Sequence, residues 1–276
     1  MSSEAGLRRE RGPATSLPGP IVWPGWLKEE LGHPALRVVD LRDADAYRGA
    51  HVPGAAHLEL RRLGSRSGNM DNVALPPAEF GELMGSMGIS NGDAVVAYDD
   101  QWGLAAARLL WMLHYYGHRD VAVLDGGWDG WVDEGGPQAT GEEEEKPGRF
   151  VAAPRSDVYA STDRIAQQIG AAGVVLVDTR TKAEFDAGHI PGAIWWDWFN
   201  AVPAGSWSVS REPAELRAEW QALGFSESDD VTVYCRSGMR AAHTYLVLRN
   251  AGFSHVRLYD GSWQEWSTTR GAGDGE

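Results

Sequence analysis

The chain has one cysteine, Cys235, and two arginines stand close to it in the segment CRSGMR. A thiol attacks other atoms as its thiolate, and neighbouring cations favour that charged form. Arg236 and Arg240 supply two such cations, and their guanidinium groups also suit an anionic ligand. Most free cysteines are inert core residues, which is the alternative interpretation. The density of positive charge beside Cys235 favours a nucleophilic site.

The residues around Cys235 predict the turn that presents it. Residues 231–234 are typical of a short buried strand and residues 241–250 of a helix, so Cys235 opens the loop between them. A helix N-terminus carries about half a positive charge and free N–H groups, which favour an anion. Gly238 suits a backbone conformation closed to other residues and the close approach of a ligand. In parallel sheets, ligands bind beyond the carboxyl ends of the strands, where this loop is expected.

A long internal repeat indicates how the chain is organised. Residues 38–56 match residues 176–194 without a gap at an offset of 138, with seven identities. Two more pairs of segments match in the same order, and they are 87–99 with 223–235 and 121–131 with 256–266. This period is too long for the unit of a solenoid. The sequence therefore predicts a duplicated domain.

Each half alternates β-branched runs with helical patterns, which predicts an α/β fold with a parallel sheet flanked by helices on both faces. The predicted division is a disordered tail over 1–20, a first domain over 21–136, a linker over 137–155 and a second domain over 156–270. The linker holds the acidic run Glu142–Glu145, which we interpret as a solvated face rather than a docking site for a basic partner.

The composition excludes several classes of protein. Of the 276 residues, 43% are hydrophobic and 23% are charged, as in soluble globular proteins. The formal net charge of −14 disfavours nucleic acid as a partner. Residues 1–20 lack the apolar core of a signal peptide, and no run of about 20 apolar residues marks a membrane span. We expect a cytoplasmic protein without membrane contact, and we expect a monomer.

Metal and cofactor signals are missing from the sequence. A single cysteine allows no intramolecular disulfide and no CxxC metal cluster. The eight histidines show no HExxH spacing, and no glycine-rich phosphate loop follows a strand. We therefore expect no metal and no cofactor.

The loop CRSGMR, the downstream DGSWQEW and the paired HVPGA and HIPGA segments resemble the rhodanese superfamily, and specifically its two-domain thiosulfate and mercaptopyruvate sulfurtransferases. The resemblance spans about residues 23–266. It implies that the second domain is catalytic and that the first lacks the cysteine. Tyr98 aligns with Tyr234, so Asp99 stands at the cysteine position, where we interpret it and Asp100 as a pair that stabilises a helix start.

The same resemblance implies a ping-pong reaction with a small anionic sulfur donor. The thiolate takes a sulfane sulfur to form a persulfide, then passes it to a thiophilic acceptor such as cyanide, a thiol or an acceptor protein. The segment that it assigns to donor binding is Arg236, Ser237, Gly238, Met239 and Arg240. Arg180 resembles its twin Arg42 in the first half, so we interpret both as structural ion-pair partners of local acids.

The donor is predicted from departures within the family pattern. Arg236 is the cation that thiosulfate sulfurtransferases place after the cysteine, whereas Ser237 matches the serine of the mercaptopyruvate enzymes. In those enzymes the serine forms a proton relay, and Asp40 and His51 would be its partners here, although structural roles for both are favoured. Glu184 stands where both classes place a donor-binding arginine. Its presence argues most against mercaptopyruvate as donor, because the carboxylate of that donor would need the arginine. We therefore predict thiosulfate as donor and 3-mercaptopyruvate as the alternative.

Two further functions remain as alternatives. Phosphatases of this fold hold cysteine and arginine at C-x5-R, whereas Cys235 and Arg240 stand at C-x4-R, which suits a ring around sulfur better than one around phosphate. A non-enzymatic binding module is the other, and its members typically lose the cysteine.

Overall fold

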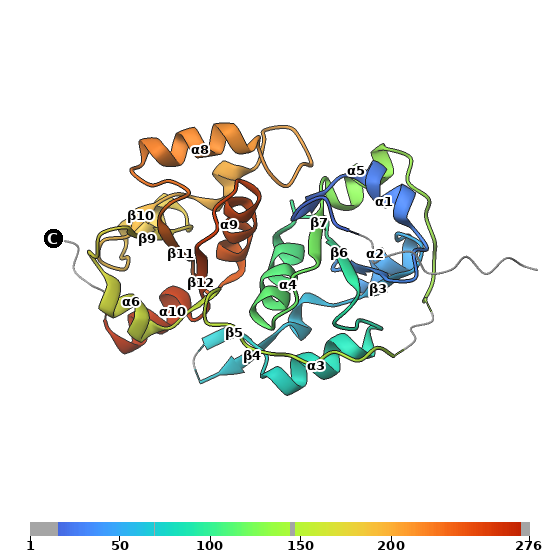
Figure 1. Ribbon diagram of the computed structural model, residues 1–276, viewed down its shortest axis with the longest axis horizontal. Helices are drawn as coiled ribbons and strands as arrows, with labels where there is room; N and C mark the ends of the chain where they lie inside the picture. The colour runs from blue at the N-terminus through green and yellow to red at the C-terminus, as the bar shows by residue number, and fades with distance from the viewer. Residues whose placement is uncertain (1–15, 69, 144–146, 272–276) are drawn as a thin grey trace, which may run out of the picture.

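Two α/β domains lie side by side in the computed structural model, which describes residues 16–68, 70–143 and 147–271 (Figure 1). Each domain is built on a five-stranded sheet in which all neighbouring strands are parallel. This confirms the duplicated α/β fold predicted from the repeats.

The elements of the first domain are β1 (Ile21–Val22), α1 (Pro24–Glu30), β2 (Leu36–Asp40), α2 (Ala44–Gly49), β3 (Ala55–His57), η1 (Leu60–Arg62), β4 (Gly64–Ser67), β5 (Met70–Ala74), α3 (Pro77–Ser86), β6 (Ala94–Tyr98), α4 (Leu104–Tyr115), β7 (Val121–Leu124) and α5 (Gly127–Asp133). The sheet order is β1-β7-β6-β2-β3, and β4 and β5 form a separate antiparallel hairpin. Helices α3 and α4 pack on one face of the sheet, and α1 and α5 pack on the other. Because both faces are covered, the central strands are continuous apolar runs.

The elements of the second domain are β8 (Tyr159–Ala160), α6 (Thr162–Gln168), β9 (Val174–Asp178), α7 (Lys182–Asp186), β10 (Ile194–Trp195), η2 (Trp198–Ala201), α8 (Pro213–Ala222), β11 (Asp230–Tyr234), α9 (Met239–Asn250), β12 (Val256–Tyr259) and α10 (Ser262–Thr269). The sheet order β8-β12-β11-β9-β10 repeats that of the first domain. Helices α8 and α9 cover one face, and α6 and α10 cover the other.

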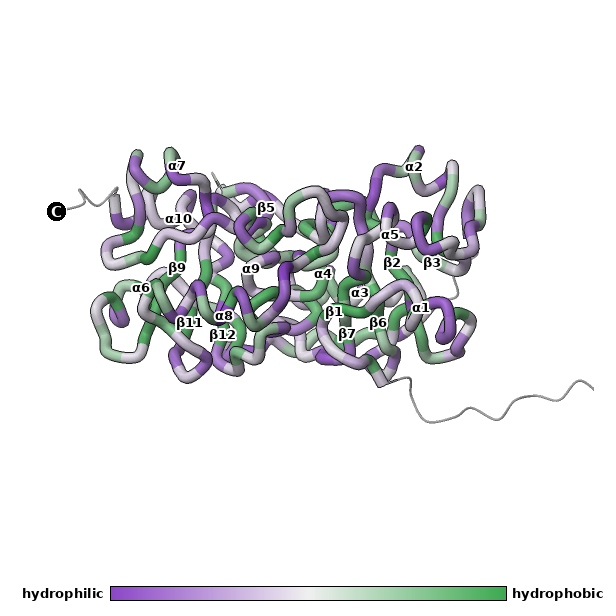
Figure 2. The backbone as a smooth tube through the Cα atoms, turned by 90° about the horizontal axis from the view of Figure 1, so that it is seen from above, coloured by the Kyte–Doolittle hydropathy of each residue, from purple (hydrophilic) through white to green (hydrophobic). Residues whose placement is uncertain are grey.

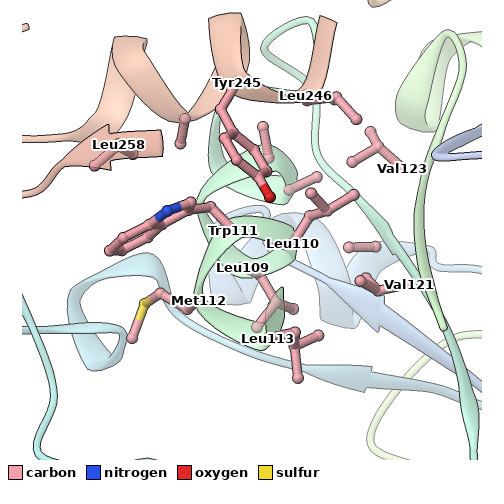
Figure 3. Close-up of a cluster of buried hydrophobic side chains, with 14 of the residues drawn as sticks. Leu109, Leu110, Trp111, Met112, Leu113, Val121, Val123, Tyr245, Leu246 and Leu258 are labelled. Atoms are coloured by element: carbon pink, nitrogen blue, oxygen red, sulfur yellow. The ribbon is translucent and has the colours of Figure 1, made fainter. Parts of the chain in front are cut away.

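The two domains share one apolar core. Helices α4 and α9, which follow the equivalent strands β6 and β11, pack against each other across the domain boundary. Leu110 and Trp111 from α4 and Tyr245 and Leu246 from α9 are buried in one cluster there (Figure 3). Burial of each such side chain stabilises the folded chain by about 1.5 to 3 kcal/mol. The domains are therefore held in a fixed relative position by their cores.

Each domain also extends a segment onto the other. From the first domain, the hairpin β4–β5 reaches the second, where the Ala74 N–H donates to Asp260 Oδ2 at 2.8 Å. From the second domain, residues 202–210 reach the first, where the Val209 N–H donates to Asp125 Oδ1 at 2.8 Å. Asp125 and Asp260 follow the equivalent strands β7 and β12. The two contacts are therefore reciprocal.

The described end of the predicted tail is attached to the first domain. The side chain of Leu17 packs on the buried cluster beneath α1 and α5, and the Pro20 carbonyl accepts the Val123 N–H at 2.9 Å. The rest of that tail, residues 1–15, lies outside the described residues.

The linker contacts the first domain instead of standing free in solvent. The Gly148 N–H donates to the Gly85 carbonyl at 2.8 Å, and the ring of Phe150 is buried. Within the acidic run, Glu143 accepts the Gly54 N–H at 2.9 Å, whereas residues 144–145 lie outside the described residues. The described part of this segment is therefore a strap over the first domain.

Hydrophobic residues follow the strands and the α4–α9 contact, while α2 and α7 at one edge of the sheets are mostly polar (Figure 2). Among the helices that the structure describes, none is long and apolar enough to cross a membrane.

Candidate active site

Cys235 directly follows β11 at the carboxyl edge of the second sheet, as the sequence predicts. The residue is 1% exposed. Its N–H donates to Ser262 Oγ at 3.2 Å, and its carbonyl accepts the Trp263 N–H at 3.0 Å. These backbone contacts with the start of α10 fix the residue without using its sulfur. The backbone of residue 235 is therefore fixed by contacts that do not involve the sulfur.

Gly238 is the residue before α9, and its backbone has a φ of 85°, in the left-handed region. A Cβ atom there would lie 2.7 Å from Nη1 of Arg108. Both the conformation and the packing therefore require glycine. Beside it, Ser237 and Met239 are half-buried and Arg236 is exposed.

The corresponding loop of the first domain holds a buried carboxyl group. The carboxylate of Asp99 is fully enclosed, 2% exposed, at the position that corresponds to Cys235. Its two oxygens accept hydrogen bonds from four backbone N–H groups at 2.7 to 2.9 Å, and the donors are Gln101, Gly103, Ala105 and Ala106. Burial raises the pKa of Asp99, and the four N–H groups act against that rise. These contacts confirm Asp99 as a helix-start residue, in a loop that also has a left-handed glycine before the helix but is one residue longer than the cysteine loop.

Arg240 is paired with Glu184. Its two terminal nitrogens bind the two carboxylate oxygens at 2.6 and 2.8 Å, and Glu184 lies in the first turn of α7, where it forms a capping box with Thr181. The hydrogen bonds from Arg240 lower the pKa of Glu184 to about 2. Burial disfavours the charged form of Arg240, but Glu184 and the neighbouring Cys235 outweigh it and raise the pKa of the guanidinium. Arg240 therefore faces the cysteine with its charge already balanced, which the sequence did not indicate.

Arg236 is the cation left for a ligand at this loop. Its exposed side chain makes no ion pair with any residue that the structure describes. It lines a cleft of about 520 Å³ together with Trp263, Gln264 and the Glu184 carboxylate. Arg180 also lines this cleft, but its guanidinium is bound to Asp178 at 2.6 Å, just as Arg42 is bound to Asp40. The structural roles predicted for these two arginines are confirmed.

Asp40 and His51 are held within the first domain. Asp40 binds Arg42 and accepts the Tyr98 hydroxyl at 2.6 Å, with no exposed surface. His51 stacks on Tyr47, and its Nδ1 lies 2.8 Å from the Tyr47 carbonyl. Within the described part of the chain neither side chain is hydrogen-bonded to the serine of the cysteine loop. The proton relay considered from the sequence is therefore not formed, and the structural interpretation fits these contacts.

Sequence reasoning missed the residues that support the loop from outside it. Asn72 binds the carbonyl of Ser237, and Arg108 forms an ion pair with Asp260 beside Gly238. Asn72 lies in the hairpin β4–β5, outside every repeated segment, so no comparison of the halves marks it. The spacing along the chain gave no signal for either contact.

Another cleft, of about 580 Å³, opens between the domains at the amino ends of the strands. Its cations are largely engaged, since Arg155 pairs with Asp157, Arg257 pairs with an aspartate, and Arg249 binds two carbonyls. It lies at the opposite edge of the sheets from Cys235. Among the described residues, no group of histidine, cysteine and acidic side chains could hold a metal ion.

Known proteins resemble this chain over nearly its whole length. Residues 24–134 and 161–269 each match the family described as Rhodanese-like domain. The sequence is 34% identical to the sulfur carrier protein TtuD of Thermus thermophilus, across 92% of this chain and 95% of that one. It is 35% identical to a thiosulfate sulfurtransferase of Corynebacterium glutamicum, across 90% and 88%. A crystal structure of SseA from Escherichia coli, described among 3-mercaptopyruvate sulfotransferases, matches with a TM-score of 0.81 at 27% identity, covering 89% and 99%.

Proposed function

The chain belongs to the rhodanese family, with two such domains in tandem, and on this premise we propose that it is a sulfurtransferase that moves a sulfane sulfur from thiosulfate to a thiophilic acceptor through a persulfide on Cys235. The observation that carries the proposal is the position of Cys235 in a strand-to-helix loop whose twin encloses the Asp99 carboxylate with four N–H groups. Backbone N–H groups gathered at the start of a helix would stabilise a negative sulfur in the same way.

The reaction proceeds in two displacements. The Cys235 thiolate attacks the outer sulfur of thiosulfate, the sulfur–sulfur bond of the donor breaks, and sulfite leaves with the electron pair. A nucleophilic acceptor then attacks the outer sulfur of the persulfide, and the Cys235 thiolate is the leaving group. With cyanide as acceptor the product is thiocyanate. In each step the negative charge on the cysteine sulfur is stabilised by the loop N–H groups and the N-terminus of α9. Arg240 is a neighbouring hydrogen-bond donor whose charge Glu184 balances.

The charges of the cleft favour thiosulfate as donor. Arg236, which makes no ion pair with a described residue, presents a guanidinium that can bind the anionic oxygens of thiosulfate. A mercaptopyruvate donor brings a carboxylate that needs a cation of its own, and position 184 on the same wall holds glutamate instead of an arginine. The structural similarity to SseA keeps 3-mercaptopyruvate as the second candidate donor.

The test is the intact mass of the protein after incubation with thiosulfate and, separately, with 3-mercaptopyruvate. Because Cys235 is the one thiol in the chain, a gain of one sulfur atom assigns the carrier directly. Gain with thiosulfate and little with mercaptopyruvate is the expected result. Gain with mercaptopyruvate alone would overturn the donor assignment, and gain with neither would overturn the sulfurtransferase proposal.

A Glu184→Gln variant is expected to bind thiosulfate more tightly. Removal of the carboxylate charge leaves Arg240 as a second uncompensated cation beside the donor site. Because Glu184 is about one third exposed, solvent screens the effect, and the expected decrease in KM for thiosulfate is about threefold. The difference from wild type should be the same at neutral and at mildly acidic pH, because the pKa of Glu184 is about 2. Steady-state kinetics at both pH values measures it, and an increase in KM would contradict the expectation.

A further inference from the structure

The hairpin β4–β5 of the first domain is fastened to the second domain on both sides of Asn72. Before it, the backbone N–H and carbonyl of Asp71 bind the side-chain amide of Gln264 at 3.3 and 2.7 Å. After it, the Ala74 N–H binds Asp260. These contacts hold Asn72 next to the loop that carries Cys235.

Asn72 is itself held in one conformation. Its backbone has a φ of 62°, in the left-handed region that asparagine tolerates better than most residues. Its carbonyl accepts Nη2 of the buried Arg108 at 2.7 Å, and Gly64 packs against it so closely that a Cβ on that glycine would lie 2.6 Å from Oδ1. The side-chain amide is thereby aimed at the second domain, where Nδ2 donates to the Ser237 carbonyl at 2.9 Å.

This hydrogen bond fixes the orientation of a whole peptide plane. The described chain has no cis peptide bond, so the Ser237 carbonyl and the Gly238 N–H point in opposite directions. With the carbonyl turned outward to Asn72, the N–H is turned inward, toward the space that the loop encloses. In the first domain Gly103 likewise precedes the helix, in a loop that is one residue longer, and its N–H donates to the enclosed Asp99 carboxylate at 2.9 Å.

The peptide needs such a fixed partner because glycine follows it. Glycine allows the preceding peptide to rotate between orientations that other residues forbid. Among the hydrogen bonds between described residues, the bond from Asn72 is the one that holds the Ser237 carbonyl. A rotated peptide would turn that carbonyl toward the sulfur and remove one N–H from the ring that stabilises it.

We propose that Asn72 is a positioning residue that reaches from the non-catalytic domain and locks the Ser237–Gly238 peptide with its N–H facing the sulfur of Cys235. The sulfur-holding loop is then completed by a residue of the other domain. The role in sulfur transfer rests on the function proposed above, but the orientation of the peptide also controls the reactivity of the free thiol.

The direct test compares Asn72→Gly and Asn72→Asp with the wild type. Glycine keeps the left-handed backbone and deletes the amide, while aspartate keeps the shape and turns a carboxylate toward the Ser237 carbonyl. Loss of one oriented N–H donor is expected to lower kcat for thiosulfate about tenfold with less than a twofold change in KM. It should also move the pH dependence of Cys235 alkylation by iodoacetamide to higher pH. Ser65→Ala on the same hairpin, which removes only a weak bond to Val73, is the matched control.

Each outcome decides a separate question. If both Asn72 variants keep the wild-type kcat and alkylation profile, the positioning role is wrong. If kcat falls together with the melting temperature while the alkylation profile stays in place, Asn72 is structural and the proposal is also wrong. If the wild type takes no sulfur from any donor but the alkylation profile still moves in the variants, the positioning role stands and the proposed function fails.

Discussion

A Cys235→Ser variant is expected to lose at least about a thousandfold of the sulfur-transfer rate. A serine hydroxyl stays protonated near neutral pH and cannot carry a sulfane sulfur through a sulfur–sulfur bond. The fold should be unaffected, because Ser262 and Trp263 contact the backbone of residue 235 and not its side chain. Thiocyanate formation from thiosulfate and cyanide measures the rate, and intact mass should show no added sulfur.

The matched control tests whether a thiol at another position can also carry the sulfur. In a Cys235→Ser/Ser254→Cys variant the thiol is moved to an exposed position at the far end of α9, away from the N–H groups of the loop. It should stay unlabelled by thiosulfate and leave the rate at the level of the single variant. Sulfur transfer by Cys235→Ser, or recovery in the double variant, would show that the loop is not the carrier site.

Replacement of Arg108 by methionine is expected to destabilise the protein by about 3 to 5 kcal/mol. Arg108 has no exposed side-chain surface, and its Nη1 lies 2.7 Å from Oδ1 of Asp260, which is 3% exposed. These two atoms are not aligned as a hydrogen bond, so the contact is chiefly electrostatic. Loss of the guanidinium leaves a buried carboxylate without its counter-charge, and it also frees the Asn72 carbonyl. Urea unfolding followed by circular dichroism measures the change.

Two further variants test whether the lost stability comes from the uncompensated charge of Asp260. Adding Asp260→Asn to Arg108→Met removes the uncompensated charge while keeping an acceptor for the Ala74 N–H, so it should recover more than half of the lost stability. Arg155→Met breaks a more exposed pair with Asp157 and should cost at most about 1 kcal/mol. A loss from Arg108→Met no larger than that of Arg155→Met would contradict the assigned role.

Local and repeated features were predictable from the sequence. The duplicated α/β fold followed from paired segments, and the position of Cys235 at a strand end followed from the apolar run before it. The ion pairs of Arg42 and Arg180 followed from their occurrence in both halves, because each partner is two residues away. Such features are visible because they depend on short separations along the chain.

Contacts between distant segments were not predictable. Arg240 was expected to bind the donor, but Glu184, 56 residues earlier, takes both of its terminal nitrogens. The relay through Asp40 was considered from family motifs, yet its oxygens are used within its own domain. No sequence pattern marks Asn72, because its contact with Ser237 depends on how one domain packs on the other. Side-chain choice at such sites follows three-dimensional proximity, which a single sequence does not record.

The two halves of this chain contact each other reciprocally, as the two subunits of a homodimer do, but they belong to one polypeptide. The equivalent helices α4 and α9 pack against each other, and each half extends a segment to the aspartate of the other through Ala74 and Val209. In a true homodimer every substitution appears in both subunits, so a cysteine-to-aspartate change would remove the nucleophilic thiol from both loops at once. Covalent fusion removes that coupling. One loop can then be filled permanently by Asp99 and serve as scaffold, while the other keeps its thiol and retains the capacity for turnover.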